Sequence, residues 1–96
     1  MTEIKIYDFA GAFAENKDVA REIRLKYVVP SVENNEEIIL NFEGVTGATQ
    51  SFIHALICNV IREYGSECLD NIDFRHCNEI IKKIISIVVE YMQEGL

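Results

Sequence analysis

The fold is decided by residues 38–65, which read IILNFEGVTGATQSFIHALICNVIREYG. At its start, Ile38, Leu40 and Phe42 fall on one side of an extended chain and Ile39 falls on the other. Strands with one solvated face alternate apolar and polar residues, whereas strands covered on both faces are apolar throughout. The segment therefore predicts a strand at the centre of a sheet.

A bend and a long helix are predicted after this strand. Gly44 and Gly47 suit a tight turn, and the Thr49 hydroxyl can accept hydrogen bonds from the free N–H groups that begin a helix. Apolar residues recur at helical spacing over residues 50–64, and Gly65 stands where a helix commonly ends. The apolar stripe of this helix consists of Ile53, Leu56, Ile57, Val60, Ile61 and Tyr64.

The residues before this segment predict a further strand and helix. Residues 3–9 alternate between apolar and polar side chains, which is typical of a half-buried strand. Asn16 can cap a helix over residues 17–28, where apolar residues again recur at helical spacing. Pro30 disfavours helical geometry at Val29, so the helix is expected to end there.

The residues after it predict a third strand and a third helix. Residues 68–74 form a weaker strand pattern with interleaved acids. From Asn78 the helical spacing returns, and Gly95 would end that helix. Its apolar residues are Ile80, Ile81, Ile84, Ile85, Val88 and Met92. The alternating strand-helix order predicts a small α/β domain over residues 1–96, with a mostly parallel or mixed sheet packed by helices.

Charge and composition exclude several classes of protein. The formal charge is −7, from 16 acidic against 9 basic residues, and the longest basic cluster is the pair Lys82-Lys83. Phosphate backbones and anionic lipids attract basic surfaces, so we expect neither nucleic-acid nor membrane binding. The chain has no apolar segment of signal-peptide or membrane-spanning length. Its three cysteines lack C-x-x-C spacing, which favours reduced thiols and a cytoplasmic location.

Residues 39–52, which read ILNFEGVTGATQSF, resemble the signature of the STAS-like family of unknown function. That signature is an aliphatic residue, Asp or Asn, Phe, a small or acidic residue, Gly and Val, followed by a loop that enters a helix at Ser-Phe. Residues 4–11 resemble the family's opening strand, and residues 72–78 resemble its last strand with the turn into the final helix. The resemblance covers most of the chain.

This family is similar to the STAS domains of anti-sigma-factor antagonists, whose corresponding loop carries Asp-Ser-Ser-Gly with one serine phosphorylated by a partner kinase. Aligning Val45 with the valine before that loop places Ser51 on the phosphorylated serine. Thr49 stands in the place of the Asp, and Phe52 stands in the place of the Gly. Members often accompany ATP-binding domains of the histidine-kinase type, so the resemblance implies such a protein as the partner of a monomer or homodimer.

The predicted site joins the loop to one face of the helix over residues 50–64. Its loop residues are Glu43, Gly44, Thr46, Gly47, Thr49, Gln50 and Ser51. Spacing places Ser51, Ala55, Cys58 and Arg62 opposite the apolar stripe, on a face with little charge that suits close approach by another protein. Free N–H groups and the helix dipole at Ser51 favour an added phosphate. The alternatives are a serine that only starts a helix and an ordinary solvent-exposed face.

Metal and enzyme chemistry find little support in the sequence. His54 and Cys58 lie four residues apart, and His76-Cys77 could complete a set of four metal ligands. No second pair has the close spacing usual for metal ligands, so we predict no metal site. Gly44 and Gly47 are too close together for a phosphate-binding loop, which also needs a lysine. Glu43 has no identifiable acid or base partner. We therefore expect no catalysis and no cofactor.

The sequence leaves three functions open. The first is a regulatory module that binds a protein partner through the loop and helix face, with control by phosphorylation. The second is a sensor that binds a small ligand at the same loop. The third is a structural subunit that self-associates through the edge of its sheet.

Overall fold

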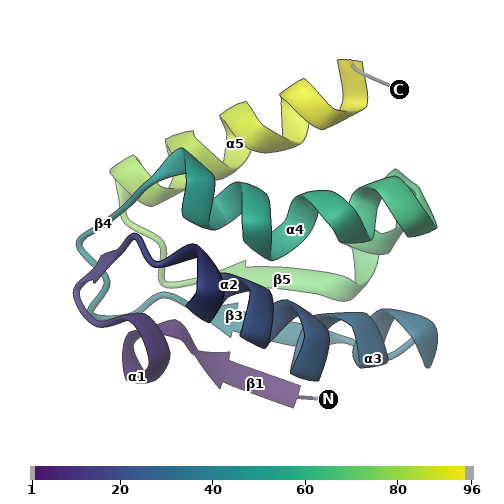
Figure 1. The fold of residues 1–96 in the computed structure, drawn as a ribbon, viewed down its shortest axis with the longest axis horizontal. Coiled ribbons are helices and arrows are strands. Elements are labelled where there is room, and N and C mark those ends of the chain that lie inside the picture. The colour runs from purple at the N-terminus through teal and green to yellow at the C-terminus, as the bar shows by residue number, and fades with distance from the viewer. Residues whose placement is uncertain (1, 95–96) are drawn as a thin grey trace.

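A three-stranded parallel sheet lies at the base of the molecule (Figure 1). The computed structural model describes residues 2–94, and its strand order is β1 (Thr2–Lys5), β3 (Ile38–Asn41) and β5 (Ile72–Arg75). All four residues of β3 are buried. The predicted central strand and the parallel α/β fold are both confirmed.

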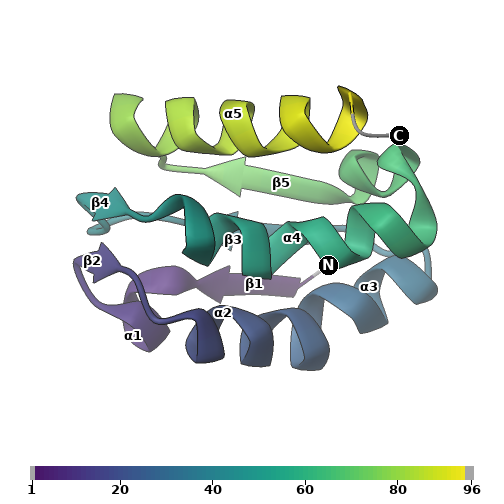
Figure 2. The same cartoon turned by 45° about the horizontal axis from the view of Figure 1, so that its top comes forward.

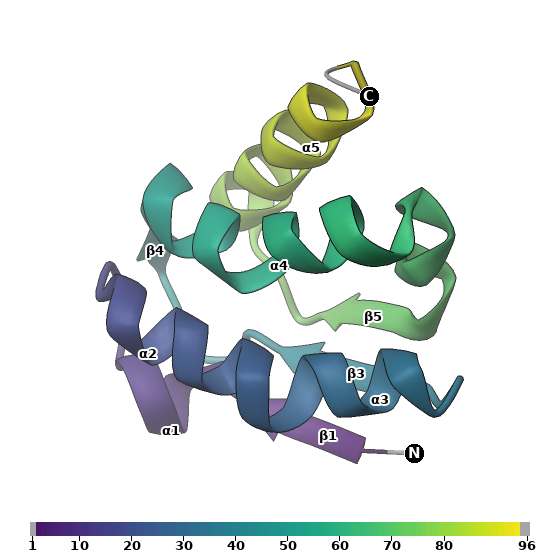
Figure 3. The ribbon, with the colours of Figure 1, turned by 45° about the vertical axis from the view of Figure 1, so that its right-hand side comes forward.

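The longer helices all cover the same face of this sheet (Figures 2 and 3). They are α2 (Lys17–Ile23), α4 (Gln50–Tyr64) and α5 (Glu79–Glu94), and α4 lies between the other two. The sheet presents Ile4, Ile38, Leu40, Ile72 and Phe74 to these helices. No helix within residues 2–94 is long and apolar enough to cross a membrane.

The other face of the sheet is polar. Its side chains are Glu3, Lys5, Asn41, Asp73 and Arg75, with Ile39 at the centre of the sheet. The Asn41 side-chain Nδ2 donates to Glu3 at 2.9 Å, and Arg75 Nε donates to Asp73 at 2.8 Å. Ile39 is 7% exposed and lies between Glu3 and Asp73 in the strand register. Its apolar side chain is thus buried among polar neighbours.

The first predicted strand is too long. β1 ends at Lys5, and residues Ile6–Ala10 form a short helix, α1. Lys5 pairs with Asn41, the last residue of β3, so a longer β1 would have no strand to pair with. The chain instead returns at β2 (Phe13–Ala14), which pairs in parallel with β4 (Gly47–Ala48). Strands of two residues are too short to show the alternation of apolar and polar side chains by which a strand is predicted from sequence.

The predicted helix end before Pro30 is wrong. α2 continues through a π-helical turn, η1 (Arg24–Val28), into α3 (Val29–Glu33). Val29 keeps helical angles, with φ −60° and ψ −49°. A proline is tolerated in the first turn of a helix, where its missing N–H is not needed. The π-helical turn before Pro30 places the proline in the first turn of α3, so the chain stays helical from α2 to α3.

The third predicted strand is also shorter than expected. Residues Ser66–Asn71 form a 3₁₀ helix, η2, and only Ile72–Arg75 extend as β5. Ile72 pairs with Ile38, the first residue of β3, so earlier residues have no strand beside them. In α5 the predicted apolar side is confirmed at Ile81, Ile85, Val88 and Met92, whereas Ile80 is 58% exposed. Gly95 lies outside the described residues.

The core is centred on α4, whose predicted ends and apolar stripe are confirmed with one exception. Ile53, Leu56, Ile57, Val60 and Ile61 are at most 1% exposed. Tyr64 is 37% exposed, and its hydroxyl donates to Glu33 at 3.0 Å. Tyr64 therefore belongs to the surface between α4 and α3, and not to the core.

Replacing Leu56 with alanine should lower the free energy of unfolding by about 2 to 5 kcal/mol, because the fully buried side chain would leave a cavity. Asn59→Ala, on the exposed side of the same helix, should change it by less than about 0.5 kcal/mol. Urea denaturation of both variants and the wild type measures the difference. Equal stability of the two variants would contradict the assigned packing of α4.

Candidate functional site

The loop over residues 43–49 is held at the carboxyl ends of the parallel strands. The Thr46 N–H donates to the carbonyl of Ala12 at 2.7 Å, and Asn78 Nδ2 donates to the carbonyl of Thr46 at 3.0 Å. Val45 is 4% exposed and anchors the loop in the core. In open α/β sheets ligands bind beyond this end of the strands.

Two aromatic rings lie directly on the loop glycines. Gly44 has a positive φ of 86°, and a Cβ there would be 3.0 Å from the ring of Tyr7. A Cβ on Gly47 would be 3.0 Å from the ring of Phe13. Tyr7 and Phe13 remain 48% and 52% exposed. A Cβ at either glycine would thus be in tight contact with an aromatic ring, and the two aromatic side chains remain at the surface beside the loop.

Ser51 is exposed in the first turn of α4. The Thr49 hydroxyl oxygen accepts a hydrogen bond from the Phe52 N–H at 3.0 Å, which confirms Thr49 as the helix cap. Phe52 is fully buried and orients the first turn against the core, while Gln50 and Ser51 face outwards. The helix start is thus fixed from inside, with the serine hydroxyl accessible.

Ser51 lies at a groove between α4 and α5, with a volume of about 460 Å³. The groove is lined by Lys17, Gln50, Ser51, His54, Ala55, Ile87, Val88 and Tyr91. Ile87 and Tyr91, one helical turn apart on α5, are 40% and 69% exposed. Neither residue was predicted from the sequence as part of the site. Their spacing, four residues apart on α5 and outside its buried apolar stripe, could have indicated an exposed apolar surface.

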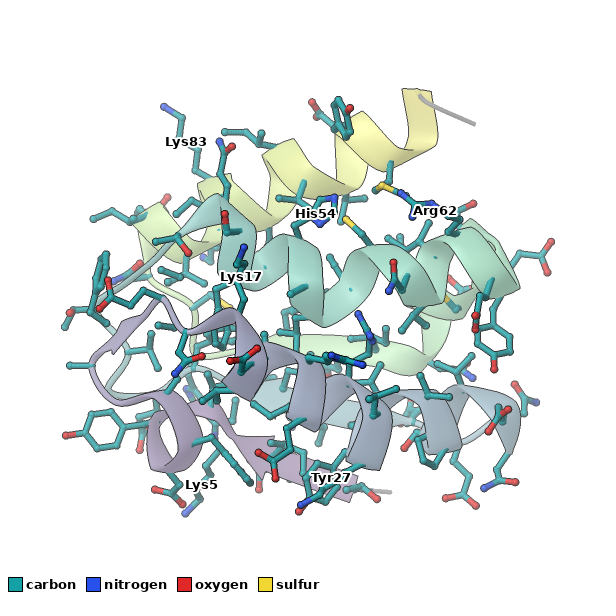
Figure 4. All side chains as sticks on the ribbon, in the orientation of Figure 1. Lys5, Lys17, Tyr27, His54, Arg62 and Lys83 are labelled. Atoms are coloured by element: carbon teal, nitrogen blue, oxygen red, sulfur yellow. The ribbon has the colours of Figure 1, made fainter. Side chains whose placement is uncertain are left out.

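A second groove, with a volume of about 390 Å³, adjoins the first between α2 and α4. It shares Lys17, His54 and Ala55 with the first groove. Its remaining lining residues are Asp18, Arg21, Arg24 and Asn59. Figure 4 shows Lys17 between the start of α2 and α4, with His54 and Arg62 further along α4. This face is therefore basic on a chain whose formal charge is −7.

The chain matches the model of a known protein family. The family model described as a STAS-like domain of unknown function matches residues 19–82, which include the loop, α4 and the strands β3 and β5. The chain belongs to this STAS-like family. No curated protein and no solved structure matched the chain.

The helix face predicted for this STAS-like domain is only partly exposed. Ser51 and Arg62 are exposed, but Cys58 is 0% exposed, so its assignment to the outward face is wrong. The reason is that α5 packs along that side of α4. Ala55 is partly buried, and its carbonyl accepts a hydrogen bond from Arg24 Nη1 at 3.0 Å. His54 and Asn59, which are also exposed, line the groove between α2 and α4.

The histidines and cysteines do not converge. His54 is exposed whereas Cys58 is buried, and His76 and Cys77 follow β5 on a different loop. Over the described part of the chain, no group of three or more His, Cys, Asp or Glu side chains is placed to hold a metal ion. Burial raises the pKa of the Cys58 thiol, and nearby Arg62 offsets this only in part, so this thiol is a weak nucleophile at neutral pH.

Replacing Thr49 with alanine should lower the free energy of unfolding by about 0.5 to 2 kcal/mol, because the Phe52 N–H would lose its side-chain acceptor. Thr49→Ser keeps the hydroxyl and should retain most of the stability. Thermal or urea unfolding of the two variants makes the comparison. A serine variant as unstable as the alanine variant would show that the threonine methyl group, and not the cap, is responsible.

Proposed function

We propose that this STAS-like domain is a cytoplasmic, non-enzymatic regulatory module that binds a protein partner through the loop and the groove beside α4. We further propose that a phosphate on Ser51 weakens this binding. The observation that supports both proposals is the position of Ser51, which is exposed at the helix start and lines the groove between α4 and α5. The partner class that the family resemblance implies is an ATP-binding protein of the histidine-kinase type.

The apolar side of the groove suits a protein partner. Ile87 and Tyr91 are exposed on α5, and Val88 closes the groove beneath them with 5% exposure. Exposed aromatic and aliphatic side chains beside a hollow are typical anchors at protein interfaces, where tyrosine is enriched. Tyr7 and Phe13 beside the loop would extend the same contact surface.

The basic side of the groove predicts the charge of that partner. Lys17, Arg21 and Arg24 line the adjoining groove, and Asp18 is the only acidic residue lining either one within the described residues. Complementary charge steers association and fixes the orientation of the partners. The partner segment that lies here should therefore be acidic, with an apolar side chain that packs against Ile87 and Tyr91.

A phosphate on Ser51 would reverse this local charge. It adds about −1.5 to −2 charges at neutral pH, next to Lys17 and His54, which line the same groove. At the start of α4 the fold tolerates the added charge because of the free N–H groups and the helix dipole. The phosphate would then repel an acidic partner segment while leaving the domain folded.

The test compares Ser51→Asp, Ser51→Ala and a matched control, Ser86→Asp, which adds the same charge at an exposed position of α5 outside this groove. Each protein is titrated calorimetrically with the ATP-binding partner at one salt concentration. Ser51→Asp should weaken binding by about tenfold or more, equivalent to about 1.4 kcal/mol, whereas the other two should bind like the wild type. Unfolding free energies of all variants should agree within about 0.5 kcal/mol.

Two results would contradict the proposal. Equal binding by all four proteins, with no phosphate added to Ser51 by the partner and ATP, would reduce Ser51 to a residue that starts a helix. Equal weakening by Ser51→Asp and Ser86→Asp would indicate a general charge effect unrelated to the groove.

A small-ligand sensor is the second candidate, because a volume of about 460 Å³ lies within the range of small-molecule pockets. Native mass spectrometry of the purified protein distinguishes the two. A bound small molecule that is lost in Tyr91→Ala would favour the sensor, whereas a ligand-free protein that binds the partner would favour the regulatory module.

A further inference from the structure

The edge of the sheet formed by β1 is open. β1 has β3 on one side, and no other strand within residues 2–94 lies on its other side. The Thr2 N–H donates to the carbonyl of Glu37 at 3.3 Å, on the β3 side. Because the backbone groups of successive residues point to opposite sides of a strand, those of Glu3 and the N–H of Lys5 point to the open side. Unpaired edge groups of this kind are a template for another strand.

We propose that β1 pairs in antiparallel orientation with β1 of a second copy of this chain, around a twofold axis at Ile4. This register places Glu3 opposite Lys5 of the second copy, and Lys5 opposite Glu3 of the second copy. The outward N–H of Lys5 then faces the outward carbonyl of Glu3 across the axis, and the same contact occurs twice. The two sheets join into one continuous sheet of six strands, because each copy contributes three.

Charge is the reason for choosing a second copy as the occupant of this edge. Glu3 and Lys5 lie two residues apart on the same face of β1, and both are exposed. An antiparallel copy of the same sequence therefore brings opposite charges together twice. Shifting the axis to Glu3 or to Lys5 would place like charges opposite each other, which destabilises a strand pair. The edge is thus complementary to itself in one register.

Phe9, on the helix that directly follows β1, forms an aromatic pair with Tyr27. The rings of Phe9 and Tyr27 meet edge to face with centroids 6.0 Å apart, and Phe9 is 41% exposed. Figure 4 places Tyr27 and Lys5 along the lower border of the molecule, where Figure 1 shows β1. Homodimer interfaces are more apolar than the rest of a protein surface. Because β1 is short, the interface is smaller than that of an obligate dimer, and assembly should depend on concentration.

This dimer leaves the α5 side of the proposed partner groove free. Figures 1 and 2 show α5 at one border of the molecule and β1 towards the opposite one. Two copies joined at β1 would therefore present two grooves. A partner with two binding segments would bind such a dimer more tightly than a monomer, because its second contact is intramolecular.

Sedimentation velocity over a concentration series tests the dimer. The wild type should show twice the monomer mass at high concentration and dissociate on dilution. A monomer mass at every concentration up to about 1 mM would overturn the proposal, because any tighter dissociation constant would be visible there.

Charge reversal at the edge tests the register. Lys5→Glu places two glutamates opposite each other in both pairs and should raise the dimer dissociation constant by about tenfold or more. Lys83→Glu, the same charge change at an exposed position of α5, is the matched control and should leave the dimer intact. A Lys5→Glu protein that dimerises like the wild type would exclude β1 as the interface.

A mixing experiment separates loss of pairing from loss of folding. Glu3→Lys leaves two lysines on the edge, and Lys5→Glu leaves two glutamates, so each variant alone should be monomeric. Mixed in equal amounts, they restore both opposite-charge pairs and should form a heterodimer with an affinity similar to that of the wild-type dimer. Failure of the mixture to associate would overturn the proposed register.

Discussion

The burial of α4 on β3 is the constraint on which the rest of the molecule depends. The apolar side of α4, with Leu56 and Ile57 fully buried, covers the central strand, and α2 and α5 pack along its flanks. A helix packed in this way keeps only part of its surface exposed. Its exposed residues are Gln50, Ser51, His54, Asn59, Arg62, Glu63 and Tyr64. The packing that stabilises the fold thus also decides which side chains of α4 a partner can reach.

Local signals in the sequence predicted α4 well because its ends depend only on nearby residues. Thr49 accepts a hydrogen bond from the backbone three residues later, and Gly65 takes a positive φ directly after the helix. The ends of β1 depend instead on where a distant strand ends. Lys5 is the last residue of β1 because its partner Asn41 is the last residue of β3. The two residues are too far apart in the sequence for a local pattern to include both.

The site was harder to predict than the fold because it combines side chains from three helices. The family resemblance is the basis for proposing the loop and Ser51 as the site. Helical spacing placed Cys58 on the exposed side because it takes no account of α5 beside α4. The same limitation hid Tyr91, whose exposure next to Ser51 follows from how the two helices pack. Residue spacing predicts which side of a single helix is apolar, whereas a groove is formed by side chains of neighbouring helices.

The distribution of charge explains how one serine could regulate this surface without affecting the rest of the molecule. The chain is acidic overall, yet Lys17, Arg21 and Arg24 line the groove between α2 and α4, and Lys17 also lines the groove that contains Ser51. Salt screens exposed charges beyond about 8 Å at physiological ionic strength, which confines the effect of a phosphate on Ser51 to the groove. The side chains of Glu3 and Lys5 lie on the face of the sheet opposite to α4. In the proposed function, phosphorylation would therefore change what the groove binds and would leave the proposed self-association unchanged.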